Sequence, residues 1–293
     1  PLDFALWKKA KDGELSWSSP WGQGRPGWHI ECSAMSCKYL GDEFDIHGGG
    51  SDLIFPHHEN EIAQTESLGE KPMAKYWLHN GFITVNQEKM SKSLGNFFLL
   101  RDILAQFDPM VVRFFLLSTH YRSPIDFDDE RLQVAQRGLE RLRNAYAQLE
   151  YGLKNAGSSE NGAKLIAATK NAQEQFVQAM NDDFNTALAI AALFDLARDI
   201  NTYSSEKELD KDALAGAKKV FEDLMGVIGI NLAVEQGEKG QILEGLMELI
   251  IEIRQTARKN KDFTTADLIR DKLKELGVIL EDAPQGTKWK INS

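Results

Sequence analysis

The chain has little of several features that define other classes of protein. It has only two cysteines among 293 residues, Cys32 and Cys37, which are too few for a disulfide framework, so a reducing cytoplasm is the expected setting. No apolar run is long enough to span a bilayer, since the longest, VVRFFLLS, is interrupted by Arg113, and no membrane partner is expected. The net charge of −10 argues against non-specific coating of nucleic acid, although it allows a local basic face.

An initiator Met and a signal peptide are also lacking. The chain begins PLDFALWKKAKDGE, which reads like the middle of a domain, so we expect a fragment of a longer protein. Its apolar content of 42% and charged content of 27% are typical of a globular protein, and its length allows two or three domains.

Histidine, tryptophan and cysteine are concentrated near the start. The first 80 residues hold both cysteines, five of the six histidines and five of the six tryptophans, which indicates loops carrying chemistry on an α/β scaffold. The segment EFDIHGGG predicts a strand leaving a sheet, at the kind of edge where open α/β folds bind ligands. A helix is expected through HHENEIAQTESLG, with Pro56 in its first turn and Gly69 closing it.

The rest of the chain is mainly helical in pattern. YWLHNGFITVN predicts a strand with a turn inside it, and two short helices should follow, separated at Asp108 and Pro109. From residue 126, apolar residues recur every three to four positions in four long segments, which predicts an all-α helical bundle over 126–231. The segment 232–293 predicts two helices and two short strands around a Pro-Gln-Gly turn. The expected domains are therefore α/β over 1–125, the bundle, and a small α+β domain.

The stretch FPHHENEIAQ combines imidazoles with carboxylates. On a helix His57 and Glu61 are four residues apart and project from one face, whereas His58 and Glu59 should point elsewhere. Zinc accepts imidazole, carboxylate and thiolate ligands, and Cys32 in GWHIECSAM is the obvious thiolate. The alternative is a solvated helix start, whose acids the helix dipole favours. The spacing alone leaves both open, and a zincin is excluded because HExxH is absent.

A second motif is KMSKS at residues 89–93, followed by LGN. Its lysines, Lys89 and Lys92, flank Ser91 on a glycine-terminated loop after a strand. Lysine at such a place can neutralise the charge that grows on a departing pyrophosphate. Two loop lysines can equally be solvated, but the full five-residue string is the second signature of class I aminoacyl-tRNA synthetases.

Together with KMSKS, the strings PWGQGRPGWHIECSAM and FDIHGGGSDLIFPHHENEIAQ closely resemble the cysteinyl-tRNA synthetase family. The resemblance continues through DDFNTALAIAALF and FTTADLIRDKLKELGVILEDAPQGTKWK, so it covers essentially the whole chain. It implies the second half of a class I Rossmann-type catalytic domain, followed by a DALR-like helical bundle and a small α+β anticodon-binding domain.

The resemblance also implies site residues. Cys32, His57 and Glu61 would bind one Zn²⁺ per subunit, and a zinc–thiolate bond would select cysteine over serine, which an ordinary pocket separates by only about 1–3 kcal/mol. Trp28 would line that pocket. The residues implied to bind ATP (taken up with Mg²⁺) or the adenylate are Gly48, Gly49, Gly50, Ser51, Asp52 and Lys92, with Lys89 beside them.

The implied reaction activates L-cysteine with ATP to cysteinyl-adenylate and transfers it to tRNA(Cys), in a monomeric protein. Basic clusters lie in RGLERLRNAY, RQTARKNKDF and KWK, where they can meet phosphates on an otherwise acidic protein. For the anticodon, Phe263 and Trp289 could stack on bases, and Arg258, Asp267 and Asp282 could hydrogen-bond their edges.

The chain departs from the family in one respect. The first family signature, HIGH, whose histidines contact the ATP phosphates, is absent, because no HxGH string occurs. A fourth zinc ligand, a cysteine, also lies upstream in the family. The spacing of Cys37 does not match it, and a small buried hydrophobe is the better interpretation of that residue. The chain alone is therefore expected to be defective in adenylation.

Three other functions are consistent with parts of the sequence. A cysteine ligase with an amino-sugar acceptor would share the catalytic part, but the basic, aromatic-bearing terminal segment favours tRNA as the acceptor. A non-catalytic tRNA-binding protein would have no physical need for KMSKS and three zinc-ligand positions. A zinc-dependent hydrolase comes last, since it lacks an assignable general base.

Overall fold

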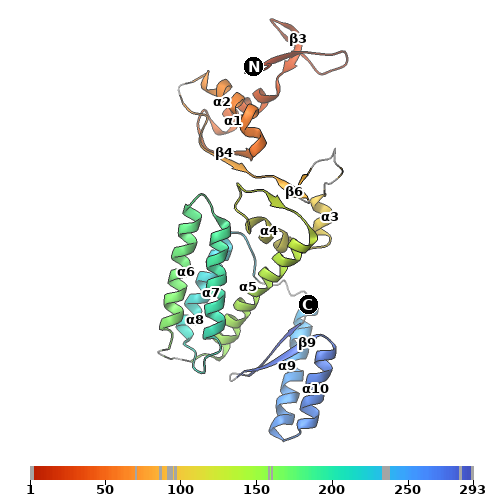
Figure 1. The fold of residues 1–293 in the computed structure, drawn as a ribbon, viewed down its shortest axis with the longest axis vertical. Coiled ribbons are helices and arrows are strands. Elements are labelled where there is room, and N and C mark those ends of the chain that lie inside the picture. Colours follow the sequence, from red (N-terminus) through yellow and green to blue (C-terminus); the bar gives the residue numbers. More distant parts are fainter. Residues whose placement is uncertain are drawn as a thin grey trace. The chain divides into compact units, whose positions relative to one another are not determined.

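The computed structural model describes residues 3–69, 71–85, 88–90, 95, 98–157, 159, 161–232, 238–283 and 286–291. The chain forms two compact units. The first comprises Pro1–Phe107 with Thr119–Leu132, and the second comprises Asp108–Ser118 with Gln133–Ser293. Figure 1 shows the elements of both units in sequence colours.

The first unit begins with a small antiparallel sheet of three strands in the order β1-β3-β2. Its strands are β1 (Trp7–Lys9), β2 (Trp17–Ser19) and β3 (Gly22–Pro26). Loops on an α/β scaffold were expected over the first 80 residues, and no strand was predicted within residues 7–26. Strands of three to five residues carry almost no alternation of apolar and polar residues, so pairing between β1 and β3, distant along the chain, decides the structure.

A parallel strand pair forms the centre of the first unit. Strand β4 (Phe44–Gly50) pairs with β5 (Ala74–Asn80) along its length, and helix α2 (Glu59–Glu66) lies between them in sequence. Such a strand–helix–strand crossover is the building unit of open α/β folds. The expected strand in EFDIHGGG is confirmed, as is an α/β fold for this part of the chain.

The helix after β4 differs from the expected one. A short 3₁₀ turn (Ser51–Leu53) and a wider turn (Ile54–His58) come first, and α2 begins at Glu59 and ends at Glu66. Phe55 has extended backbone angles, φ −133° and ψ 133°, which keep Pro56 out of the helix proper. The helix α1 (Trp28–Leu40), which packs against α2, was not predicted.

The remaining elements of the first unit are short. Strand β6 (Ile83–Val85) pairs antiparallel with β7 (Glu88–Lys89) and parallel with β8 (Ile125–Asp126), and α3 spans Leu100–Leu104. Helix α4 (Pro109–Leu117) belongs to the second unit. Asp108 caps it by accepting a 2.8 Å hydrogen bond from the Met110 amide, so the expected break between two helices is confirmed.

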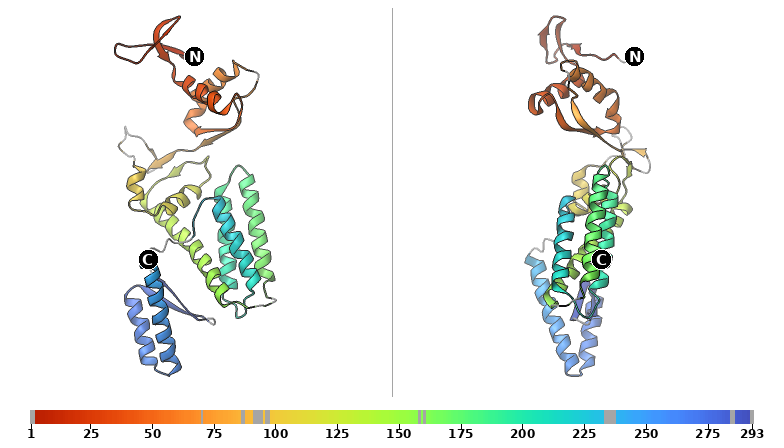
Figure 2. Two further views of the ribbon diagram at one scale, coloured as in Figure 1. Left: turned by 180° about the vertical axis from the view of Figure 1, so that it is seen from behind. Right: turned by 90° about the vertical axis from the view of Figure 1, so that its left-hand side faces the viewer.

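The second unit contains the predicted helical bundle. Its helices are α5 (Asp129–Asn155), α6 (Ala163–Asn181), α7 (Thr186–Tyr203) and α8 (Lys211–Val227). Helices α6, α7 and α8 lie side by side in both views (Figures 1 and 2). The buried faces of all four helices form the core, which includes Leu139, Leu142, Leu149, Leu165, Leu193, Leu196, Ile200, Leu214 and Phe221.

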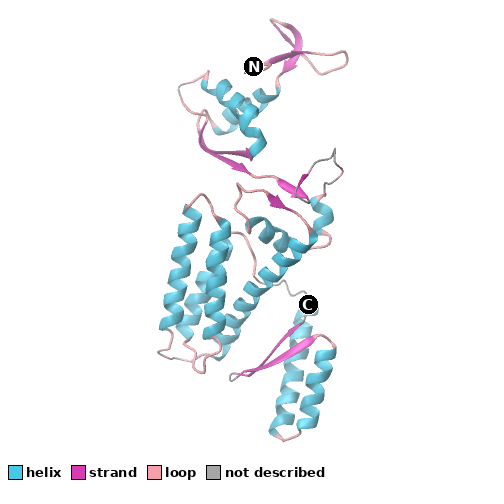
Figure 3. Cartoon of the chain, in the orientation of Figure 1, coloured by secondary structure: helices cyan, strands magenta, loops and turns pink. Residues whose placement is uncertain are grey.

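The last part of the chain is a helix pair with a hairpin, as predicted. Helices α9 (Glu238–Lys259) and α10 (Phe263–Glu275) pack together, and β9 (Val278–Ala283) pairs antiparallel with β10 (Gly286–Ile291). Figure 3 separates these helices and strands by colour. Among the described residues, no helix is both long and apolar enough to cross a membrane.

Candidate functional site

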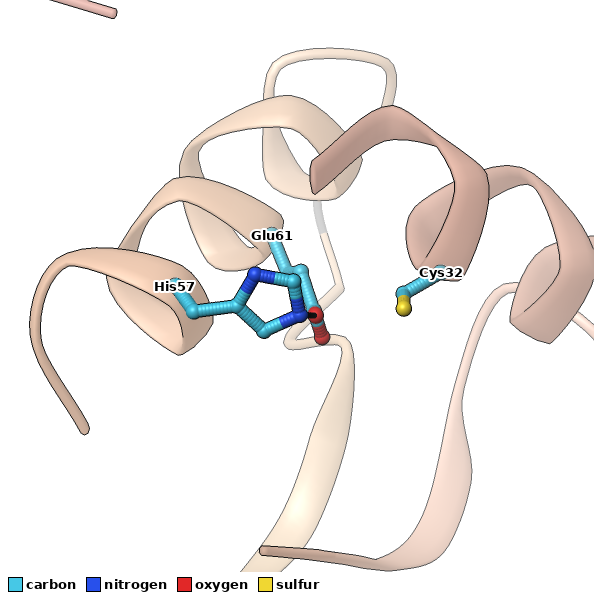
Figure 4. A group of neighbouring side chains, drawn as sticks. All are labelled: Cys32, His57 and Glu61. Carbon is cyan, nitrogen blue, oxygen red and sulfur yellow. Dashed lines mark ion pairs between the residues drawn. The ribbon is translucent and has the colours of Figure 1, made fainter. Parts of the chain in front are cut away.

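Three side chains from two helices and a turn converge in the first unit (Figure 4). Cys32 comes from α1, His57 from the turn Ile54–His58, and Glu61 from the first turn of α2. One potential ligand atom from each, the Cys32 thiol, a His57 ring nitrogen and a Glu61 carboxylate oxygen, lies within 4.8 Å of the others. His57 Nε2 is 2.5 Å from Glu61 Oε1. The packing of α1 on α2 therefore brings a residue distant in sequence to the His-Glu pair.

Glu61 is the most enclosed member of this group. Its exposed fraction is 0%, and neither carboxylate oxygen has a correctly aligned hydrogen-bond donor among the described residues. The second oxygen, Oε2, faces the Nε2 atom of His47 at 3.0 Å. An enclosed carboxylate removed from water is costly, and a cation held between it and the neighbouring lone pairs would lower that cost.

A layer of further histidines surrounds the group. His57 Nδ1 lies 2.7 Å from His29 Nδ1, and His58 Nδ1 lies 2.8 Å from His79 Nε2. Such contacts fix the orientation of an imidazole and leave its other nitrogen available. The expectation that His58 points elsewhere was wrong, because His58 is buried and forms a second triad with His47 and Glu61. His58 belongs to the turn before α2, so ideal helix geometry does not describe its direction.

Burial favours neutral side chains throughout this site. It raises the pKa of Glu61 to about 7 and, together with the charge of Glu61, raises the pKa of the Cys32 thiol. Burial lowers the pKa of His57, and burial with the charge of His47 lowers the pKa of His58 to about 4. Neutral imidazoles offer lone pairs to a metal, and a metal would bind the acid and the thiol by displacing their protons.

The chemistry of these donors fits zinc. Thiolate, imidazole and carboxylate are its usual protein ligands. Three protein ligands with a free fourth position are typical of catalytic zinc sites, in which a substrate or water completes the coordination. The enclosed carboxylate of Glu61, with imidazole nitrogens of His57 and His47 against its two oxygens, is the structural observation that supports this fit.

The residues predicted to surround the substrate lie beside His57 and His58. Trp28 is the first residue of α1 and is 63% exposed, and its ring centroid lies 5.0 Å from that of His57. Gly48, Gly49 and Gly50 end strand β4. A Cβ on Gly49 would come within 2.9 Å of the His58 ring, so glycine there allows the strand end to pack against that histidine.

The other residues predicted to bind ATP follow directly. Ser51 and Asp52 form the 3₁₀ turn after the glycines. The backbone of Lys89 is part of β7, whereas its side chain and the whole of Lys92 lie outside the described residues.

The residues predicted to contact the anticodon lie in the last part of the chain. Arg258 donates to Asp282 Oδ2 at 3.0 Å. Asp282 also accepts two hydrogen bonds, of 2.8 and 2.9 Å, from the buried Arg254. Phe263 opens α10 with 59% of its surface exposed. The two remaining predicted residues form no hydrogen bond or ion pair with Asp282 in the described part of the chain. Asp267 pairs with Arg270, and the half-buried Trp289 lies on β10.

Sequence reasoning missed several residues of these sites. His29, His47 and His79 surround the metal-ligand group, and Arg254 holds Asp282. The only signal was the crowding of histidines in the first 80 residues. These contacts join positions 14 to 28 residues apart, so no short pattern could identify the pairs.

Three family models match the chain. Residues 1–137 match the class I (C) tRNA synthetase catalytic domain, residues 175–233 match the DALR domain, and residues 247–289 match the cysteinyl-tRNA ligase anticodon binding domain. The matches follow the order of the α/β part, the bundle and the terminal helix pair with its hairpin.

Curated relatives match nearly the whole chain. A cysteine–tRNA ligase of Heliobacterium modesticaldum is 60% identical over an alignment of 304 positions, gaps included, which covers 99% of this chain and 63% of the relative. A cysteine–tRNA ligase of Geobacillus thermodenitrificans is 55% identical over an alignment of 294 positions, gaps included, which covers 100% of this chain and 62% of the relative. The chain thus spans about three fifths of the length of these relatives.

Two solved structures share the fold at low sequence identity. One is the ternary complex of Agrobacterium radiobacter K84 agnB2 LeuRS-tRNA-LeuAMS, with a TM-score of 0.55 and 19% identity, covering 77% of this chain and 34% of that one. The other is a putative arginyl-tRNA synthetase from Campylobacter jejuni, with a TM-score of 0.54 and 12% identity, covering 78% and 58%.

The catalytic-domain match, the parallel strand pair with its crossover and the helical domain together define a class: class I aminoacyl-tRNA synthetases. Within that class, the match of the terminal domain and the identity to curated relatives determine the family. The chain belongs to the cysteinyl-tRNA synthetase family.

Proposed function

We propose that this chain supplies the amino-acid pocket, the KMSKS loop and the tRNA-binding part of a cysteine–tRNA ligase. The reaction joins cysteine to ATP to give cysteinyl-adenylate and pyrophosphate, then transfers the cysteinyl group to a ribose hydroxyl of tRNA(Cys) with release of AMP. One observation carries the proposal: Cys32, His57 and Glu61 bring their ligand atoms within 4.8 Å around an enclosed carboxylate.

Cys32, His57 and Glu61 would hold one Zn²⁺, which when bound would supply an open coordination position for the thiolate of the substrate cysteine. His29 orients the His57 ring through the 2.7 Å contact between their Nδ1 atoms. Trp28, which stacks beside His29 and His57, would cover the apolar side of the bound amino acid.

The glycines at the end of β4 would let the adenylate approach the backbone, with Ser51 and Asp52 on the following turn. Lys89 and Lys92 would neutralise the charge of the departing pyrophosphate. These groups bind and position ATP, and the chemistry asks little more of the protein than positioning and charge neutralisation.

The segment from residue 232 would bind the anticodon. Phe263 offers an exposed ring and Trp289 a half-buried one, as base stacking requires. Arg258 reaches the surface while it is paired with Asp282, so either group could exchange that partner for a base edge. Asp267, paired with Arg270, is a weaker member of the set.

An amino-sugar cysteine ligase is the main alternative. The match of residues 247–289 to an anticodon binding domain favours tRNA as the acceptor, since an amino sugar needs no such domain. The same match is compatible with a non-catalytic tRNA-binding protein, but the convergence of three potential zinc ligands favours the ligase.

Metal content tests the proposal directly. Purified wild-type chain should retain about one zinc per chain, whereas C32S and H57A should lose most of it, because each removes one of three protein ligands. C37S is the matched control, since Cys37 is a free cysteine on the same helix α1. After exchange to Co²⁺, added cysteine but not serine should strengthen the sulfur-to-metal absorption band.

A chain without bound metal, or C32S with wild-type metal content, would contradict the assignment of the ligands. Equal spectral responses to cysteine and serine would contradict the assignment of the substrate. The far-ultraviolet circular dichroism of each variant separates loss of metal from loss of fold.

A further inference from the structure

A groove runs between α5 and α7 in the second unit and shares no residue with the metal-ligand group or the anticodon-binding segment. It encloses about 470 Å³ and is lined by Arg141, Asn144, Phe194, Ala197, Arg198, Asn201, Thr202 and Ser205. On α7 the lining extends from Phe194 to Thr202, which is about 12 Å at the rise of an α-helix, and Ser205 follows just beyond the end of that helix. Ala197 leaves room for the hollow because its side chain is only a methyl group.

The charge of this groove differs from that of the protein. The whole chain carries −10, yet the described lining includes two arginines and no acidic side chain. Three other hollows on the same unit each include at least one glutamate. A groove that excludes acids on an acidic protein attracts anions locally while the remaining surface repels them.

Arg141 is held in place by the ring of Phe194. Its guanidinium carbon lies 5.0 Å from the ring centroid, a cation–π contact that orients the group before any ligand arrives. The same contact covers the one aromatic face in the groove. The groove thus offers cations and amides rather than an open aromatic platform, which suits phosphates better than unpaired bases.

The remaining polar groups are also suited to phosphate. The amide groups of Asn144 and Asn201 have no hydrogen-bond partner in the described part of the chain and can donate to phosphate oxygens. Arg198 pairs with Asp195 at 2.9 Å, but that pair is exposed, and exposed ion pairs exchange partners at little cost. The hydroxyls of Thr202 and Ser205 donate to backbone carbonyls of α7, so they contribute no donor.

We propose that the α5–α7 groove binds the phosphate backbone of a base-paired stem of tRNA, with Arg141 and Arg198 as its anion contacts. This inference rests on the proposed function, because it takes tRNA as the ligand. It adds a second contact surface outside the anticodon-binding segment and gives a role to the basic cluster RGLERLRNAY.

The test is tRNA(Cys) binding by fluorescence anisotropy at several salt concentrations, with the whole chain and its double variant R141Q/R198Q. Loss of two phosphate contacts should weaken binding at least tenfold at about 0.1 M salt. It should also reduce the slope of log affinity against log salt by about 1.4–1.8. The control K170Q/K219Q removes the same charge from exposed, ion-paired lysines of α6 and α8, and should change affinity less than twofold.

Two results would overturn the inference alone. In the first, R141Q/R198Q binds like wild type while F263A, in the anticodon-binding segment, binds more weakly. In the second, both double variants lose affinity equally, which indicates net charge rather than a groove. If the wild-type chain does not bind tRNA, the proposed function fails and this inference fails with it. Thermal melts of all variants confirm that they are folded.

Discussion

At the scale of single residues, the pair Arg254–Asp282 determines what the last part of the chain can do. Arg254 is 3% exposed and donates to both carboxylate oxygens of Asp282, at 2.8 and 2.9 Å. Thr287 donates to the same carboxylate at 2.8 Å. These contacts, Arg254 above all, hold the pKa of Asp282 well below its usual range. They join α9 to both strands of the hairpin.

Replacing Asp282 with Asn should destabilise this part of the chain at neutral pH, because Arg254 stays buried without its counter-charge. Breaking a buried pair costs about 3–5 kcal/mol, and we expect less here because Asp282 is half exposed. The folded-state pKa of Asp282 is depressed, so its contribution is present above pH ~4 and is lost as the pH falls below that value.

Urea unfolding between pH 7 and pH 2.5 measures both effects. Wild type should lose more stability than D282N over the acid part of this range, so their difference should shrink. D267N is the matched control, since Asp267 makes an exposed pair with Arg270. An acid dependence unchanged by D282N would contradict the prediction.

A second prediction at this scale concerns Phe263. Its exposed ring has no packing role comparable to its size, so F263A should leave the fold intact. If Phe263 stacks on an anticodon base, its loss should weaken tRNA(Cys) binding about 5- to 150-fold, since one stacked base contributes roughly 1–3 kcal/mol. L276A removes another exposed apolar side chain of the same segment and should not change affinity. Wild-type affinity of F263A would contradict stacking.

At the scale of elements, the metal-ligand group depends on how α1 meets α2. His57 lies in the turn Ile54–His58 and Glu61 in the first turn of α2, so the local backbone alone brings these two side chains together. Cys32 reaches them only because α1 packs on α2. Ser33 supports that packing, since its hydroxyl donates to Gln64 Oε1 of α2 at 2.8 Å and both residues are buried. The two helices thus act as one support for the site.

The bundle is held by apolar burial rather than by its surface ion pairs. Leu193 on α7 is completely enclosed, so L193A should cost about 2–5 kcal/mol of unfolding free energy, through lost burial and the cavity left behind. Leu188, on the same helix, is 56% exposed, and L188A should cost well under 1 kcal/mol. Chemical denaturation followed by circular dichroism compares the two, and similar costs would contradict this account of the core.

At the scale of the whole molecule, the family motifs that the chain contains determine which steps of the proposed reaction it should perform alone. It spans about three fifths of the length of its curated relatives and contains KMSKS but no HxGH string. By the resemblance to the family, histidines of that missing string contact the ATP phosphates. Metal binding and tRNA binding, in contrast, draw on residues that are present.

We therefore predict that the chain alone shows no cysteine-dependent exchange of labelled pyrophosphate into ATP, although it binds zinc and tRNA. Serine serves as the control substrate, and bound metal shows that the sample is folded. Exchange with cysteine only would establish the amino-acid specificity and show that the HxGH string is dispensable. Exchange with serine as well would contradict selection by a metal–thiolate bond.

Much of the fold follows from local patterns in the sequence. Apolar residues at helical spacing predicted α5 to α10, Asp108–Pro109 predicted the break before α4, and EFDIHGGG predicted β4. The failures lie where the pattern is short or the partner is distant. The three-stranded sheet of residues 7–26 and helix α1 were missed, because strands of three residues and a helix of mixed polarity carry little periodic signal.

By itself, the sequence determined the helical bundle, the terminal helices and hairpin, and the spacing of His57 and Glu61, because each depends on interactions within a few residues or one turn. Only the tertiary structure brought Cys32 to that pair, enclosed Glu61 among histidines, joined Arg254 to Asp282 and opened an acid-free groove between α5 and α7. These arrangements depend on which faces of distant elements pack together, and that choice is made by the burial of the whole chain rather than by any short segment.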